Sequence, residues 1–130
     1  IKGRELLKTG GKYYIADAGM RSYLDSYRNT NTGRVLENLV YNQLVFDDYD
    51  VLVGHLRGGE VDFVATKPRQ KMYVQVTEDM HDEETMRREL APLKRIGDEY
   101  RKIVVVAEGT YPADIDGIEI VNIIDFLLHR

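Results

Sequence analysis

Apolar residues recur with helical spacing in several stretches of the chain. After Asp17, which is placed to cap a helix, four apolar residues follow the i, i+3, i+4, i+7 pattern: Met20, Tyr23, Leu24 and Tyr27. Three further helices are expected at residues 32–46, 82–100 and 123–128. Pro92 lies inside the longest of them and is expected to kink or divide it.

Strand-like runs fill the regions between these helices. Three of them are separated by short, turn-rich connections, which predicts an antiparallel meander of residues 51–56, 60–66 and 72–78. Residues 102–107 form a nearly continuous apolar run of the kind buried in a parallel pair, and a last strand is expected at 118–121. With a short strand expected at 12–15, the pattern predicts an α/β fold with a mixed sheet.

Polar side chains interrupt two neighbouring strands of this meander. Because side chains alternate along a strand, Glu60 and Asp62 are expected on one face and Val61 and Phe63 on the other. Gln75 and Thr77 are likewise expected to share one face of the next strand. Glu37 falls at the border of the buried arc of its helix, at the same end of the sheet. Carboxylate and amide oxygens suit a hard divalent ion, so the candidate metal ligands are Glu37, Asp62 and Gln75.

The helix-meander-helix-strand order and these residues resemble the PD-(D/E)xK nuclease superfamily. There the corresponding pattern is Glu in the first helix, Asp on the second strand and Glu-x-Lys on the third, which Glu37, Asp62 and Gln75-x-Thr77 parallel. The resemblance implies a restriction-endonuclease-like αβββαβ core, preceded by a short strand and helix. It also implies that the acids hold Mg²⁺, which orients a water and neutralises charge on the phosphate, while the lysine positions that water.

The third strand departs from the superfamily pattern at both positions. Gln75 stands in place of the Glu and contributes no charge, so we expect Mg²⁺ to bind weakly. Thr77 stands in place of the lysine and supplies no positive charge; the nearest substitutes in sequence are Lys71, Arg87 and Arg88. In the alternative interpretation, Gln75 is an ordinary buried amide bonded to the backbone. The four catalytic positions, Glu37, Asp62, Gln75 and Thr77, are therefore expected to be inactive or weakly active.

A second resemblance covers nearly the whole chain. Residues 12–19 (KYYIADAG), 35–38 (VLEN) and 89–93 (ELAPL) resemble the domain of unknown function at the C-terminus of bacterial and archaeal AAA+ type ATPases. It implies that residues 1–31 are the end of a preceding winged-helix-like segment and that 32–130 form the nuclease-like domain. It also implies an upstream ATP-binding module. ATP would bind there, because Gly10-Gly11-Lys12 lacks the remaining residues of a phosphate loop.

Charge is distributed unevenly along the chain. The formal net charge is -4, but residues 1–34 carry seven Lys/Arg against three Asp/Glu, a balance of +4. A net acidic chain argues against a dedicated nucleic-acid binder, whose affinity comes largely from neutralising phosphates. The basic head leaves two interpretations: a solvated surface, or a phosphate contact through Lys12, Arg21, Arg28 and Arg34.

Composition excludes several other classes of protein. The chain has 130 residues, 43% hydrophobic and 31% charged, as expected for one globular unit rather than a disordered chain. It has no cysteine, which excludes disulfides and thiol nucleophiles and leads us to expect a reducing cytoplasm. Neither a membrane-spanning run nor a leader is expected. Because Ile1 is not a methionine, we expect an excerpt of a longer protein. The three histidines are scattered and are interpreted as surface or strand-end residues: His55, His81 and His129.

Three functional hypotheses follow from these observations. The leading one is a nuclease-fold accessory domain of a larger ATPase, non-catalytic or weakly active, that binds nucleic acid or a protein partner. The second is an active Mg²⁺-dependent DNA or RNA endonuclease that uses Glu37, Asp62 and Gln75 with a base from elsewhere. The third is a purely structural or oligomerising interaction module in which the site is vestigial.

Overall fold

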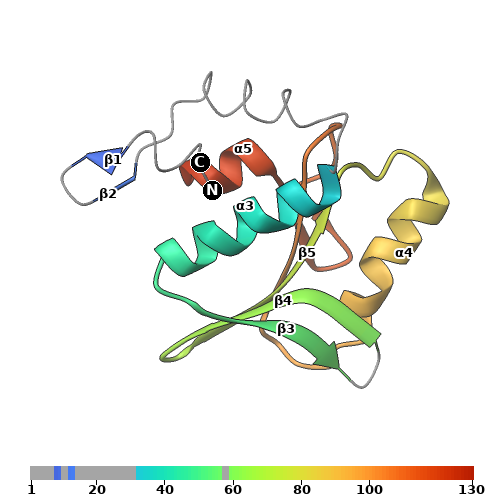
Figure 1. Ribbon diagram of the computed structural model, residues 1–130. Coiled ribbons are helices and arrows are strands. Elements are labelled where there is room, and N and C mark those ends of the chain that lie inside the picture. Colours follow the sequence, from blue (N-terminus) through green and yellow to red (C-terminus); the bar gives the residue numbers. More distant parts are fainter. Residues whose placement is uncertain (1–7, 10–11, 14–31, 57–58) are drawn as a thin grey trace.

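A computed structural model describes residues 8–9, 12–13, 32–56 and 59–130 (Figure 1). The helix expected after Asp17 and most of the segment 1–31 lie outside the described residues. The elements are β1 (Lys8–Thr9), β2 (Lys12–Tyr13), α3 (Thr32–Phe46), β3 (Asp50–Leu56), β4 (Gly59–Lys67), β5 (Gln70–Thr77), α4 (Glu83–Lys94), β6 (Arg101–Val106), β7 (Asp114–Ile115), β8 (Ile118–Asn122) and α5 (Ile123–Leu128).

A six-stranded mixed sheet in the order β3-β4-β5-β6-β8-β7 forms the centre of the fold. The meander of β3, β4 and β5 is antiparallel, as the short turns predicted. The pairs β5-β6 and β6-β8 are parallel, in agreement with the apolar run that forms β6. The chain therefore has the mixed α/β fold that the sequence predicted.

Helices cover both faces of this sheet (Figure 1). On one face α3 and α5 pack on the strands through a cluster that includes Leu36, Leu39, Val40, Val74 and Val105. On the other face α4 packs through a second cluster of buried residues: Val61, Tyr73, Met80, Leu90, Leu93, Val104 and Ile118. The arc predicted for residues 32–46 is confirmed, since its leucines and Val40 are at most 1% exposed. In the described part of the chain, no helix is long and apolar enough to span a membrane.

A β-bulge in β4 was not predicted. The register pairs Leu52 with Val64 and Gly54 with Val61. An advance of two residues along β3 therefore corresponds to three residues along β4, which contains the extra residue. The extra residue breaks the alternation of side chains: Val61 joins the cluster under α4, while Phe63 joins the cluster under α3. The prediction that Val61 and Phe63 share one face is therefore wrong. Asp62 lies between them, at the bulge.

Two other boundaries differ from the predicted ones. Helix α4 ends at Lys94 instead of Tyr100, with Arg95 as its C-cap, and the following segment contains Asp98, which accepts hydrogen bonds from the Tyr73 hydroxyl and the Tyr100 N–H. Tyr100, the last residue of the helix predicted from the sequence, lies outside α4 and is 50% exposed. The loop before β8 contains the short strand β7, which pairs with β8 through a turn at Asp116 and Gly117, both with positive φ.

Candidate functional site

Side-chain hydrogen bonds replace the backbone ladder where β4 and β5 separate. The pairing between these strands ends at Phe63 and Val74. Beyond it, the Asp62 N–H donates to Oε1 of Gln75 at 2.7 Å, and the Val76 N–H donates to Oδ2 of Asp62 at 2.8 Å. Gln75 is only 8% exposed, so its oxygen satisfies a backbone donor in a nearly buried position. This is the arrangement of the alternative interpretation, a buried amide bonded to the backbone.

Helix α3 brings Glu37 close to Asp62. The pKa of Glu37 is raised by partial burial of its carboxyl and then by the negative charge of Asp62, while Arg34 lowers it. Burial also raises the pKa of Asp62, against the lowering effect of the Val76 N–H bond. The two acids that match the superfamily pattern therefore lie within electrostatic reach of each other.

A third carboxylate, which the site prediction did not include, approaches from α4. Burial raises the pKa of Glu89, and the charges of Asp62 and Glu37 raise it further, while Arg88 opposes them. Glu89 precedes the buried Leu93 by four residues, so both lie on the inward face of α4. That spacing was the signal available in the sequence. We call Glu37, Asp62 and Glu89 the acidic group.

The remaining predicted site residues have other partners. The Thr77 hydroxyl donates to the backbone oxygen of Asp79 at 3.1 Å, so it is engaged in the turn that follows β5. Glu60 is exposed and pairs with His55 at 3.0 Å. The structure thus brings Glu37, Asp62 and Gln75 together, and it engages Thr77 elsewhere.

Among the described residues, the positive charges that act on the acidic group belong to arginines. Lys71 lies at the start of β5, with its Nζ 5.1 Å from the Tyr73 ring centre and 5.3 Å from that of Tyr100. Arg87 is exposed on α4. Of the substitutes named for the missing lysine, Arg88 is the one whose charge acts on the acidic group, through Glu89.

The predicted nucleic-acid contacts are only partly within the described residues. Arg34 is exposed near the start of α3, and its charge acts on Glu37. Lys12 belongs to β2, but its side chain lies outside the described residues, as do Arg21 and Arg28 entirely.

The acidic group is not closed around an ion. Among the described residues, one set of three His, Asp or Glu side chains has its ligand atoms all within 4.8 Å of one another, and it is Asp79, His81 and Glu108. The acidic group does not meet this spacing, so binding of a divalent ion there would require its side chains to rotate inward. An ion would relieve the repulsion among the three carboxylates.

Glu89→Gln is expected to stabilise the fold at neutral pH by roughly 0.5–1 kcal/mol, the range for single, partly screened charges. The raised pKa of Glu89 in the wild type means that the folded state binds the proton more tightly than the unfolded state does. The stability of the wild type therefore falls as pH rises from the ordinary carboxyl range through the folded pKa. The variant should flatten this dependence in urea denaturation at several pH values. Glu84→Gln, in the exposed first turn of α4, is the control and should be neutral or slightly destabilising. If stability depended on pH in the same way in the wild type and in Glu89→Gln, the inferred repulsion between Glu89 and the other carboxylates would be contradicted.

Comparison with known proteins gives a relative but no function. No model of a known protein family matches the chain. The chain is 36% identical over 132 residues to a protein of Haemophilus influenzae described as an uncharacterized protein. The alignment includes 98% of this chain and 31% of the relative, so the chain spans about a third of that protein's length.

Proposed function

We propose that the chain is a nuclease-fold accessory domain of a larger ATPase that binds a partner without cleaving nucleic acid. The order of α3, the β3-β5 meander, α4 and β6 supports a restriction-endonuclease-like core. The observation that supports a loss of cleavage is the set of hydrogen bonds made by Gln75 and Thr77 of β5, the third strand of the meander. Gln75 Oε1 accepts from the Asp62 N–H and the Thr77 hydroxyl donates to Asp79, so both positions serve the fold.

Phosphodiester hydrolysis in the superfamily needs more than acids. A metal ion must be held and a water positioned beside the phosphate, and the superfamily uses a lysine for the second task. Here Thr77 occupies that position without charge, and Lys71 lies over two tyrosine rings. Among the described residues, the arginines whose charges act on the acidic group are Arg34 and Arg88, and a guanidinium offers hydrogen-bond donors only, so it cannot serve as the base.

The second candidate function is an Mg²⁺-dependent endonuclease, and one observation favours it. Glu89 supplies a third carboxylate beside Glu37 and Asp62, which replaces the negative charge missing at Gln75. In this alternative the acidic group would hold the ion, with Glu89 contributed by α4 instead of by the third strand.

A cleavage assay separates the two candidates. The chain is incubated with Mg²⁺ or Mn²⁺ and plasmid, single-stranded DNA or RNA, beside Asp62→Asn, which keeps an acceptor for the Val76 N–H. We expect no cleavage by either protein. Cleavage by the wild type that Asp62→Asn and Glu89→Gln each abolish would establish the endonuclease and overturn the accessory role.

The partner that the described surface favours is a protein. Residues 35–130 carry a net charge of -8, which repels phosphates. The edge strand β3 exposes two adjacent apolar residues, Leu52 (69%) and Val53 (59%). Apolar side chains on an unpaired strand edge are suited to pairing with another chain. We therefore expect no shift in fluorescence polarisation of labelled DNA or RNA at low salt; saturable binding that Arg34→Ala weakens would assign the partner to nucleic acid instead.

ATP dependence is assigned to the parent protein and not to this domain. Residues 12–19, 35–38 and 89–93 support this assignment, because they resemble the tails of AAA+ type ATPases. The test is ATP hydrolysis by the full-length parent protein beside the isolated chain. Activity in the parent alone supports the assignment, and its absence from both overturns it.

A further inference from the structure

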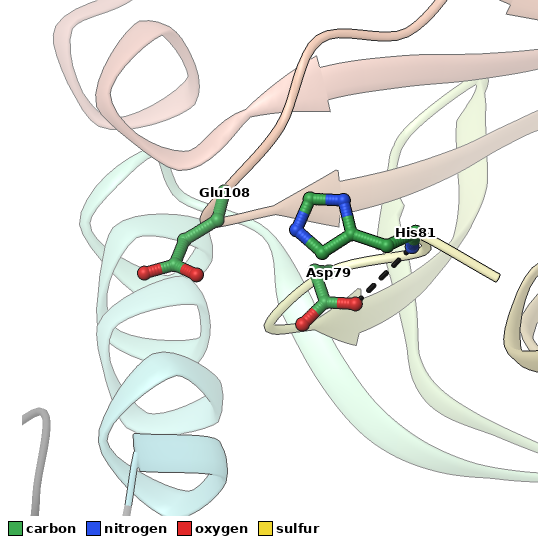
Figure 2. Close-up of side chains that lie close together, drawn as sticks. All are labelled: Asp79, His81 and Glu108. Carbon is green, nitrogen blue, oxygen red and sulfur yellow. Dashed lines mark hydrogen bonds between the residues drawn. The ribbon is translucent and has the colours of Figure 1, made fainter.

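A second group of potential metal ligands lies at the carboxyl ends of β5 and β6. Asp79 and His81 belong to the connection from β5 to α4, and Glu108 follows β6. One ligand atom from each lies within 4.8 Å of the other two. Figure 2 shows the imidazole of His81 pointing toward Glu108, with the Asp79 side chain beside it. The carboxyl ends of parallel strands are where open α/β sheets commonly bind ligands.

Backbone hydrogen bonds hold the two segments side by side. Past the ends of the strands, the Ala107 N–H donates to the Thr77 oxygen at 3.1 Å, and the Glu108 N–H donates to the Glu78 oxygen at 2.8 Å. The Thr77 hydroxyl and the His81 N–H both bond to Asp79, at its backbone oxygen and at Oδ1. The backbone positions from which the three side chains extend are thus held by hydrogen bonds just past the ends of β5 and β6 and by the turn at Asp79.

Tyr111 lies beside the histidine. Its hydroxyl accepts the Met80 N–H at 2.7 Å, and its ring stacks with the His81 ring at a centroid distance of 6.5 Å. Gly109 permits this approach, because a Cβ there would lie 2.6 Å from the Tyr111 hydroxyl and its φ is +94°. The imidazole is therefore supported from one side by a residue of the loop that also carries Glu108.

We propose that Asp79, His81 and Glu108 bind a divalent transition metal ion such as Zn²⁺. One imidazole nitrogen and two carboxylate oxygens are a donor set suited to Zn²⁺ and its neighbours, whereas Mg²⁺ and Ca²⁺ prefer oxygen alone. Ligand atoms around a tetrahedral zinc are roughly 3.4 Å apart, given bonds of about 2.0–2.2 Å, so small side-chain rotations complete the site. Three protein ligands leave a position for water.

This site is separate from the acidic group in its ligands and its chemistry. It uses a histidine and the turn after β5, whereas the acidic group uses carboxylates of α3, β4 and α4. The bound ion would link the segment entering α4 to the loop after β6. The proposal does not depend on the nuclease-like function, since neither resemblance supplies any of its three residues.

Isothermal titration of the chelator-treated chain with ZnCl₂ tests the proposal. We expect saturable binding with a stoichiometry of one, which His81→Ala and Glu108→Gln each weaken by at least about tenfold. Millimolar Mg²⁺ should not compete. At zinc concentrations about 100 times the Kd, the melting temperature of the wild type should rise by roughly 5–10 °C, and that of His81→Ala should not rise at the same concentrations.

Two control variants locate the ion. His55→Ala removes an exposed histidine on β3, and Asp62→Asn removes a charge of the acidic group; both should bind Zn²⁺ as the wild type does. Replacement of Zn²⁺ by Co²⁺ adds a spectroscopic test, because visible absorption bands should appear in the wild type and be lost in His81→Ala. The proposal is overturned by an absence of saturable binding, by unchanged affinity in His81→Ala, or by loss of affinity in Asp62→Asn.

Discussion

Replacing Gly54 by alanine is expected to lower the free energy of unfolding by about 1–3 kcal/mol, the usual cost of overpacking a filled interior. Gly54 is buried on β3, opposite the bulge of β4. A Cβ at this position would lie 2.2 Å from Cγ2 of Val61, 2.9 Å from its backbone oxygen and 3.1 Å from Cγ2 of Val64. Rotation of the Val61 side chain can relieve the first contact but not the second, so the strands must separate.

Urea denaturation followed by circular dichroism measures this effect, and Gly33→Ala is the matched control. Gly33 lies in the first turn of α3, where an added Cβ would meet none of the described residues within 4 Å, so alanine there should be neutral or stabilise the helix by up to about 1 kcal/mol. The double variant Gly54→Ala/Val61→Ala should show coupling between the two sites, because the shortest contact is removed. If Gly54→Ala changes the free energy of unfolding no more than Gly33→Ala does, β3 does not approach the bulge of β4 as closely as the structure shows.

The bulge also explains which part of the site the sequence could not predict. Strict alternation placed Val61 and Phe63 on one face, but a residue inserted into β4 turns them to opposite faces. No local pattern signals that insertion, because Gly54 opposite it resembles any other strand glycine. The bulge and the end of the β4-β5 ladder together allow the Asp62 carboxylate to reach the Val76 N–H.

The elements themselves were more predictable than their contacts. Helical and alternating periodicities identified α3, α5 and the meander, because burial on one face imposes the spacing of apolar residues. The end of α4 was missed, since the segment after Arg95 is held by contacts of Asp98, one of them with the Tyr73 hydroxyl on a distant strand. Glu89 and the proposed zinc ligands Asp79, His81 and Glu108 were missed for a related reason. Each lies near side chains of other segments of the chain, and the spacing of residues within one segment does not show such contacts.

Replacing Asp62 by alanine is expected to lower the free energy of unfolding by about 1–3 kcal/mol, the cost of leaving a buried backbone donor without a partner. The donor is the Val76 N–H, which is bonded to Asp62 Oδ2 at 2.8 Å, beside a side chain that is 9% exposed. Asp62→Asn keeps an oxygen acceptor for the Val76 N–H and removes a charge that burial disfavours. It should therefore be close to the wild type in stability, or slightly more stable, at neutral pH.

The pH dependence distinguishes the hydrogen bond from the charge. The pKa of Asp62 is raised in the folded state, so the wild type loses stability as pH rises from the ordinary aspartate range through that pKa. Asp62→Asn should lack this loss, whereas Asp62→Ala should be less stable than Asp62→Asn at every pH measured. Equal destabilisation by Asn and Ala would show that the negative charge itself stabilises the fold, which is the result expected if a cation occupies the acidic group. The same pair of variants thus reports whether Asp62 serves the sheet or a metal ion.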